Sequence, residues 1–369
     1  MEEEAGIYRL AEDSLRQIFC RLPLREIMIC RSVSKFFLQL LSTPSFLQVL
    51  SSSHPPLQLL ALRNRHHTPS HTSLPLFDPA TKSWLHFPLD FLPFHSPLPV
   101  ASSLGLLYLW AHNNSNSNSN SKSLICCNPL TRTFRVLPHL GSAWSRHGSV
   151  LVDSEDRVMV LTELAALYCH RNTTTWLKFS SNLPSKPRSS LLINDSAFAL
   201  CDVGSPWRNR WKLFSCTIKS TTTSVVPVWS PLDRHEWGDV FDVLNRPRLV
   251  RGGHGNFILM VGGLKSSFAL NAPCSTILVL RLDLDNLRWD EAARMPPEMF
   301  RAFRESTKFK VFGGAGDMVC FSAKRIGKLA LWDRRASEGH EWRWIDNLPE
   351  NGKGLYRGFV FEGRLNAVP

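Results

Sequence analysis

Residues 10–46 read LAEDSLRQIFCRLPLREIMICRSVSKFFLQLLSTPSF, and their apolar residues recur at the spacing of a helix. The first apolar group, at positions i, i+3, i+4 and i+7, comprises Leu15, Ile18, Phe19 and Leu22. Asp13 is expected to cap this helix, and Pro23 to end it because proline lacks the backbone N–H. Two further apolar groups follow, and Pro44 ends the last of them. The stretch therefore predicts three short amphipathic helices.

A helical unit of this size buries too little apolar surface to fold alone, since a chain below roughly 40 residues usually needs a metal, a disulfide or a partner. Cys20 and Cys30 show no metal-binding spacing and no reason to pair. We therefore expect the remaining apolar surface to face another protein. The alternative is that the helices only cap the domain that follows them.

The stretch resembles an F-box, whose pattern is Leu-Pro, an Ile-Leu pair, a second Leu-Pro, and Val-Ser-Lys before an aromatic residue. The matching residues are Leu10, Ile18-Phe19, Leu22-Pro23, Val33-Ser34-Lys35 and Phe37, with Phe46 closing the motif. Ala11 replaces the first proline of the pattern, and Phe37 stands where tryptophan is usual. The resemblance implies docking to the adaptor of an SCF-type ubiquitin ligase. The residues that it assigns to this contact or its support are Leu10, Leu15, Ile18, Leu22, Pro23, Ile27 and Val33.

The composition is that of a globular protein, with 43% hydrophobic and 20% charged residues among 369. We expect a helical domain at 1–50, a linker at 51–56 and a larger domain at 57–369. No apolar run is long enough to cross a membrane, and the acidic N-terminus does not look like a signal peptide. The nine scattered cysteines fit reduced thiols, so the expected location is the nucleus or cytoplasm.

The positive charge lies outside the first domain. Residues 1–50 contain six basic and six acidic residues, so the whole formal net charge of +12 belongs to residues 51–369. Such a domain could attract nucleic acid, anionic lipid or an acidic protein. No run of five basic residues concentrates the charge, which favours a diffusely basic surface over nucleic-acid binding.

The region after residue 56 contains many short β-rich runs separated by turn residues, which is typical of a sandwich, a barrel or a propeller. A repeat decides among these: Asp-Pro or Asn-Pro is followed by an aromatic residue and then by an apolar-Pro pair. Phe77-Asp78-Pro79 leads to Trp84, and Cys127-Asn128-Pro129 leads to Phe134, which lies 50 residues further on. The asparagine-serine tract at 113–121 is predicted to be a disordered loop.

The repeat resembles the kelch repeat, and an F-box followed by kelch-like units is a domain order common in plant F-box proteins. The resemblance implies a mainly β fold, a kelch-type propeller after a small all-α domain. Six blades fit best, seven is the alternative, and the strand at 356–361 is expected to close the ring.

No motif for catalysis, a metal or a cofactor stands out. His66, His67 and His71 lie in a Pro/Ser-rich segment without cysteine or carboxylate partners at zinc spacing. Propellers bind ligands at the mouths of their central channel, through loops. The loop residues of the types enriched at binding hot spots are Trp207, Arg208, Arg210, His235, Trp237, Arg301 and Arg304.

These observations favour a non-catalytic substrate-recognition subunit of an SCF-type E3 ubiquitin ligase. The helices would hold the adaptor, and through it the cullin and RING subunits, while the propeller would hold a protein target. One alternative is a regulatory binding protein that acts without the adaptor. The other is a propeller-fold enzyme, against which the chain's four tyrosines argue, because they lie in predicted strands or in the N-terminal segment.

Overall fold

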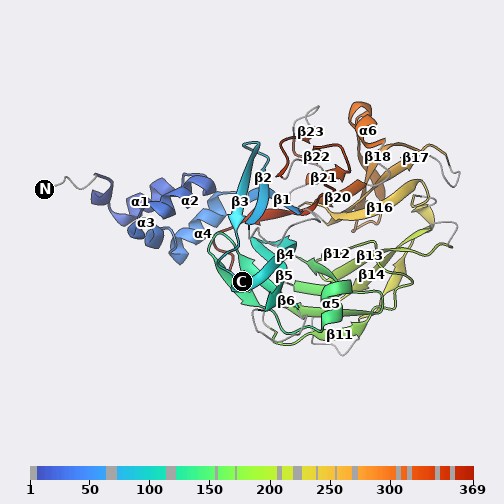
Figure 1. The fold of residues 1–369 in the computed structure, drawn as a ribbon, viewed down its shortest axis with the longest axis horizontal. Helices are drawn as coiled ribbons and strands as arrows, with labels where there is room; N and C mark the ends of the chain where they lie inside the picture. The colour runs from blue at the N-terminus through green and yellow to red at the C-terminus, as the bar shows by residue number, and fades with distance from the viewer. Residues whose placement is uncertain are drawn as a thin grey trace.

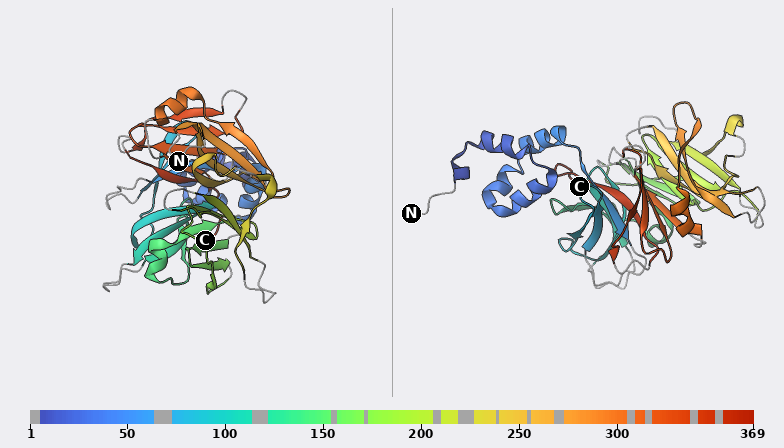
Figure 2. Two further views of the ribbon diagram at one scale, coloured as in Figure 1. Left: turned by 90° about the vertical axis from the view of Figure 1, so that its right-hand side faces the viewer. Right: turned by 90° about the horizontal axis from the view of Figure 1, so that it is seen from above.

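The computed structural model describes residues 6–63, 73–113, 122–153, 157–170, 173–205, 210–218, 227–237, 240–253, 256–267, 273–304, 309–313, 318–336, 341–349 and 354–369. Within them the chain forms an N-terminal group of helices and a ring of six four-stranded sheets (Figure 1). The helices stand beside the ring, and the C-terminus lies where the two parts meet (Figure 2). The predicted order, a small helical domain followed by a β-propeller, is confirmed.

The helical domain has one more α-helix than the sequence predicts. Its elements are the 3-10 helix η1 (Gly6–Arg9) and the helices α1 (Glu12–Phe19), α2 (Leu24–Val33), α3 (Lys35–Leu40) and α4 (Pro44–Ser53). Pro44 does not only end a helix. It occupies the first turn of α4, where its missing N–H has no partner to lose. The expected linker at 51–56 is therefore too long, because α4 continues to Ser53.

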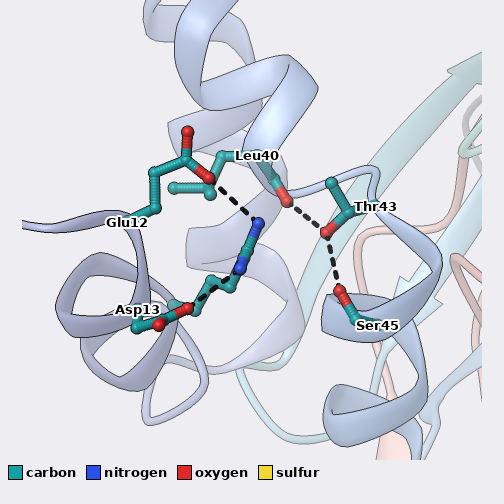
Figure 3. A network of polar contacts seen from close by, with 6 residues as sticks. Glu12, Asp13, Leu40, Thr43 and Ser45 are labelled. Atoms are coloured by element: carbon teal, nitrogen blue, oxygen red, sulfur yellow. Dashed lines mark hydrogen bonds and ion pairs between the residues drawn. The ribbon is translucent and has the colours of Figure 1, made fainter.

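The start of α1 also differs from the prediction. Ala11 is the N-cap residue, and no side chain caps it. Asp13 lies inside the first turn, where Arg16 donates to both Asp13 and Glu12 at 3.0 Å (Figure 3). The two carboxylates still stabilise this end through the helix dipole. The side-chain cap belongs instead to α3, where Ser34 Oγ accepts from the Phe37 N–H at 3.2 Å.

The helices pack around a small core of their own. Phe19 and Phe37 meet edge to face with ring centroids 5.1 Å apart, so the phenylalanine in place of the usual tryptophan fills the core. The other buried apolar residues of this domain are Leu15, Ile27, Leu40, Leu41, Phe46 and Leu50. At the helix junction, Thr43 Oγ1 donates to the Leu40 carbonyl at 2.9 Å and receives a contact from Ser45 (Figure 3).

Each blade is an antiparallel sheet whose innermost strand lines the central channel. Blade 1 consists of β24 (Arg357–Gly363), β1 (Leu57–Arg63), β2 (Ser73–Asp78) and β3 (Ser83–Pro88). Blade 2 consists of β4 (Phe94–Ser103), β5 (Leu106–Asn113), β6 (Lys122–Asn128) and β7 (Thr133–Val136). Blade 3 consists of β8 (Ser149–Val152), β9 (Arg157–Leu161), β10 (Ala165–His170) and β11 (Leu177–Ser180). Of the predicted disordered tract, Asn113 ends β5, and 114–121 lie outside the described residues.

The second half of the ring repeats this order. Blade 4 consists of β12 (Ser189–Ile193), β13 (Ser196–Asp202), β14 (Trp211–Thr217) and β15 (Ser230–Leu232). Blade 5 consists of β16 (Leu244–Arg251), β17 (Phe257–Lys265), β18 (Cys274–Asp283) and β19 (Trp289–Arg294). Blade 6 consists of β20 (Phe309–Gly313), β21 (Met318–Ala323), β22 (Leu329–Asp333) and β23 (Trp342–Ile345). Short helices precede three blades: α5 (Ser142–His147), η2 (His235–Trp237) and α6 (Pro297–Arg304).

The last strand closes the ring, as the sequence predicts. β24 pairs antiparallel with β1 from Leu57↔Gly363 to Arg63↔Arg357. The innermost strands of neighbouring blades contact one another all the way around the ring, with β24 between β20 and β4. Because the ring is closed, each blade packs between two other blades, and no blade has a face left open to solvent as it would at the end of an open row. Six blades are thereby confirmed.

The repeat residues fix the turns and the spaces between blades. The Asp78 carboxylate accepts from the Ala80 N–H at 2.9 Å, and the Asn128 side chain accepts from the Leu130 N–H at 3.0 Å, which builds the tight turn after the third strand. The Trp176 indole donates to the Pro138 carbonyl of the preceding blade at 2.9 Å. This aromatic residue, which directly precedes the outer strand β11, therefore links neighbouring blades.

Candidate functional site

The helical domain carries a concentration of exposed apolar side chains. Among its predicted adaptor-binding residues, Leu10, Ile18 and Val33 are 43%, 46% and 63% exposed. Large apolar side chains at the surface usually mark a protein–protein contact when they are grouped. The large apolar residues that are exposed in this domain are Ile7, Leu10, Ile18, Ile29, Val33, Leu38 and Val49.

The other predicted adaptor-binding residues hold these side chains in place or lie beside them. Leu15 and Ile27 are fully buried in the helical core, so they support the surface without forming it. Leu22 is partly buried against the same core, and Pro23 is exposed at the N-cap of α2. The structure therefore divides the predicted set into a buried support and an outward-facing group.

Sequence reasoning missed two residues on α2 and α3. Ile29 is 55% exposed and precedes Val33 by one helical turn, so the two share a face of α2. Leu38 is exposed on α3. The i, i+4 spacing of Ile29 and Val33 was the available signal, but spacing alone does not tell a face turned to solvent from one turned to the core.

The helical domain is fixed to one end of the propeller. Leu130 and Leu365, both from the propeller, are buried in the helical core. Arg25 Nη2 on α2 lies 2.8 Å from the carboxylate of Asp78, which ends β2 and is almost fully buried. An apolar contact and an ion pair thus connect α2 to the turns of blades 1 and 2.

The strand β24 shows which end of the channel this is. Gly363 pairs with Leu57, the first residue of β1, next to the helices. Arg357 pairs with Arg63 at the other end of the same strand. Seven residues of β-strand span roughly 23 Å, so the two ends of the channel are well separated. We call the end at Gly363 the near end and the end at Arg357 the far end.

A hollow of about 1200 Å³ opens at the far end, and basic side chains surround it. Among its described lining residues, the acidic side chain is Asp202, and the Gly204 and Arg210 backbone N–H groups already donate to that carboxylate at 3.1 and 3.0 Å. We call this hollow the basic mouth; its lysine and arginine residues are Arg63, Arg146, Lys186, Arg188, Arg248, Lys310 and Arg357.

Arg248 is a residue of the basic mouth whose charged form is disfavoured by its surroundings. The pKa of Arg248 is lowered to about 10. Burial is the largest cause, and the neighbouring charges of Arg188, Arg246 and Arg357 contribute the rest. Its Nη1 donates to the Pro247 carbonyl at 2.8 Å. The charges that act on this guanidinium are thus other arginines, which means that they lie close enough to repel one another.

The near end of the channel has a different balance. A cavity of about 320 Å³ there is lined by Arg251, Glu362 and Arg364 among others. Arg364 pairs with Glu362 at 3.0 Å. Burial lowers the pKa of Arg251, but the carboxylates of Asp153 and Glu362 act in the opposite direction. The near cavity is therefore close to neutral, in contrast to the basic mouth.

Of the residues predicted to bind a substrate, those that the structure describes are absent from the lining of both cavities. Trp207 and Arg208 lie outside the described residues. Arg210 is exposed, and its backbone contacts Asp202 at the edge of the basic mouth. His235 on η2 and Arg301 and Arg304 on α6 are exposed on connections between blades 4, 5 and 6.

Trp237 requires a correction, because it is a core residue and not a loop residue open to a ligand. It is 7% exposed, and its indole N–H donates to the Leu287 carbonyl at 2.7 Å. Its ring packs against Phe241 and Trp289 with centroids 5.9 and 5.7 Å apart. The aromatic residue that looked like a binding anchor fills the space between blades 4 and 5.

The cysteines of the propeller are mostly buried thiols. Burial raises the pKa of Cys201 and of Cys216 to about 11, and it raises that of Cys127 and Cys320 as well. In the described part of the chain, no three His, Cys, Asp or Glu side chains are grouped to hold a metal ion. The helices found there are also too short or too polar to span a bilayer.

Comparison with known proteins agrees with this architecture. Residues 7–48 match the F-box domain family, and residues 73–357 match the KIB1-4 beta-propeller family. SKP1-interacting partner 15 of Arabidopsis thaliana is 58% identical, with 100% of both chains covered. An F-box/kelch-repeat protein of Arabidopsis thaliana is 37% identical over 96% of this chain and 86% of its own. The Protein ABERRANT PANICLE ORGANIZATION 1 of Oryza sativa subsp. indica is 26% identical over 97% of this chain and 88% of its own. The chain therefore belongs to the plant F-box proteins that carry a KIB1-4 beta-propeller.

Proposed function

We propose that this protein is the substrate-recognition subunit of an SCF-type E3 ubiquitin ligase. The observation that carries the proposal is the group of exposed apolar side chains on the F-box helices, which Ile18, Ile29 and Val33 represent. The match to the F-box family supports it. So does the name of the 58% identical relative, SKP1-interacting partner 15.

In this role the F-box helices bind the SKP1-type adaptor, and the adaptor connects the chain to the cullin and RING subunits. The propeller holds a target protein at the same time. Ubiquitin transfer is then accelerated by proximity, because the target's lysines are kept near a ubiquitin-loaded enzyme. The chain supplies no catalytic group of its own, and it acts in the nucleus or cytoplasm.

The attachment of the two domains suits this task. Arg25 and Asp78 join α2 to blade 1, and Leu130 and Leu365 bury the contact. A fixed attachment keeps a bound target at a constant distance from the adaptor. The far end of the channel then faces away from the helices, where a target does not compete with the adaptor.

The test is co-purification of the full chain with an SKP1-type adaptor. An Ile18→Asp/Val33→Asp variant places two carboxylates in the apolar contact, and it should weaken adaptor binding by roughly 30-fold or more. Because both side chains are exposed in the free protein, the variant should keep the wild-type melting temperature.

The matched control is Leu164→Asp/Leu177→Asp, which makes the same chemical change at two exposed apolar residues of blade 3. It should bind the adaptor as the wild type does. If the folded wild-type chain binds no adaptor, or if both variants lose binding equally, the ligase proposal fails. The protein is then a propeller-based regulator that acts without the adaptor.

A further inference from the structure

The basic mouth is assembled from residues that are far apart in the sequence. Arg63 and Arg357 come from blade 1, Arg146 from α5, Arg248 from blade 5 and Lys310 from blade 6. Lys186 and Arg188 come from the segment before β12. With seven basic residues and one acidic residue in its described lining, the mouth has a formal charge of about +6 (seven minus one).

Several of these side chains are held in position by contacts with neutral groups. Arg63 Nη1 donates to the Pro99 carbonyl at 3.0 Å. The guanidinium of Arg188 lies 6.0 Å from the centre of the Trp211 ring, at a distance typical of a cation–π contact. The Arg248 guanidinium donates to a carbonyl and faces other arginines. A cluster of fixed like charges is costly in the free protein and favours the binding of an anion.

The two ends of the channel provide an internal comparison. At the near end, the carboxylates of Asp153 and Glu362 act on Arg251. At the far end, the acidic lining residue Asp202 already accepts two backbone N–H groups. Among the described residues, acidic side chains thus balance the basic ones at the near end, whereas at the far end seven basic lining residues lie with one acidic residue. This difference points to a ligand that supplies the negative charge.

We propose that the basic mouth binds an acidic segment of the target polypeptide, so that carboxylate-bearing side chains lie against the arginines and lysines of the far end. This inference rests on the proposed function, because it names the kind of target that the ligase recognises. The hollow holds about 1200 Å³, which is enough space for a segment of polypeptide to enter it.

A nucleic acid fits these features less well. Single strands are usually held by stacking of bases on exposed aromatic rings. The aromatic residues among the described lining are Phe312, which is buried, and Phe359, which is partly buried. The hollow also lies at the centre of a closed ring, where it suits a chain that enters with one segment better than a long phosphate backbone.

The experiment measures the fluorescence anisotropy of a fluorescein-labelled peptide of alternating Glu and Ser with the full-length protein at low salt. A twin peptide with Gln in place of Glu gives the charge control, and a poly-dT oligonucleotide of similar length gives the nucleic-acid control. The mouth variant is Arg146→Glu/Lys186→Glu, which changes two exposed side chains. The matched variant is Lys178→Glu/Arg288→Glu, which makes the same change of net charge at exposed residues away from the mouth.

We expect the Glu peptide to bind the wild type, the Gln peptide not to bind, and the mouth variant to bind about tenfold more weakly. The matched variant should stay within about twofold, and added salt should weaken binding. Equal losses in the two variants, equal binding of the Gln peptide, or tighter binding of the oligonucleotide through the same arginines would overturn the proposal. The assay needs no adaptor, so failure of adaptor docking and failure of this inference give separate results.

Discussion

At the scale of one residue, Arg248 shows how a charge that suits a binding site can lower the stability of the fold. Its guanidinium is largely buried and lies among Arg188, Arg246 and Arg357, which together with burial lower its pKa to about 10. We predict that Arg248→Met, which keeps the length of the side chain and removes the charge, raises the free energy of unfolding by about 1 kcal/mol. For a domain of this size the melting temperature should rise by roughly 2 °C.

Thermal unfolding at low salt checks this prediction, with Arg248→Lys as the control that keeps a charge at the same place. The lysine variant should not be stabilised. The gain from methionine should shrink when salt is added, because salt screens the repulsion between the arginines. A methionine variant that melts below the wild type would mean that Arg248 stabilises the propeller through packing, and that its like-charged surroundings cost little.

The buried thiols predict how stability depends on pH. Burial raises the pKa of Cys201 and Cys216 from 9.0 to about 11, so above pH 9 the unfolded chain loses protons that the folded chain retains. Their contribution is fully present below pH 9 and is lost as pH rises through 11, by on the order of 2 kcal/mol per thiol. Urea unfolding at pH 8 and at pH 10.5 should show a smaller loss in Cys201→Ala than in the wild type. An equal loss in both would exclude this thiol as a cause.

At the scale of the helix, the sequence predicted the existence of elements better than their ends. The pattern predicts Pro44 as the end of one helix, whereas it opens the next, because proline is accepted both after a helix and in its first turn. The pattern also predicts Asp13 as a cap, whereas it lies in the first turn and pairs with Arg16. Proline and aspartate are each compatible with both of the helix positions in question. The packing of Leu15 and Phe46 in the helical core fixes which position each residue takes.

The contact between α2 and blade 1 predicts how the two domains are coupled. Asp78 is 3% exposed at its side chain, and Arg25 pairs with it at 2.8 Å. Arg25→Ala leaves this buried carboxylate with its backbone donors alone, which should cost about 1–3 kcal/mol and expose the segment around His54 to proteases. Adaptor affinity should remain as in the wild type, while ubiquitin transfer to a bound target should slow.

Arg132→Ala is the matched control, because it breaks a second Arg–Asp pair of similar length, 2.9 Å to Asp90. Both partners of that pair are more than half exposed, so its loss should change stability by less than about 1 kcal/mol. Equal sensitivity of both variants to limited proteolysis would show that Arg25 and Asp78 do not couple the domains.

At the scale of the whole molecule, the ring was predictable and the basic mouth was not. The repeat of Asp78 or Asn128 before an aromatic residue fixes one blade at a time, so the architecture follows from local patterns. The mouth joins charges such as Arg63 and Lys310 that are more than two hundred positions apart. A search for runs of basic residues finds none, because closure of the ring brings single charges together.

Closure of the ring gives the last prediction. A chain that stops after Tyr356 lacks β24, so β1 keeps β2 but loses its second partner strand, and β20 and β4 lose the strand between them. It also loses Leu365 from the core under the F-box. We expect this chain to aggregate or to remain soluble only as larger assemblies, because an unpaired apolar edge pairs with other chains. Size-exclusion chromatography and urea unfolding measure both effects.

The control for this truncation is a chain that stops after Ala367. It keeps β24 and Leu365, and it keeps the Ala367 carbonyl that accepts from the Asn128 side chain at 2.8 Å. It should be monomeric and should unfold at the same urea concentration as the full chain. If the chain that ends at Tyr356 is also monomeric with unchanged unfolding, the ring does not depend on β24, and the far and near ends of the channel are not fixed by that strand. A loss confined to the shorter chain means instead that the last strand holds the blades, the basic mouth and the seat of the F-box in one arrangement.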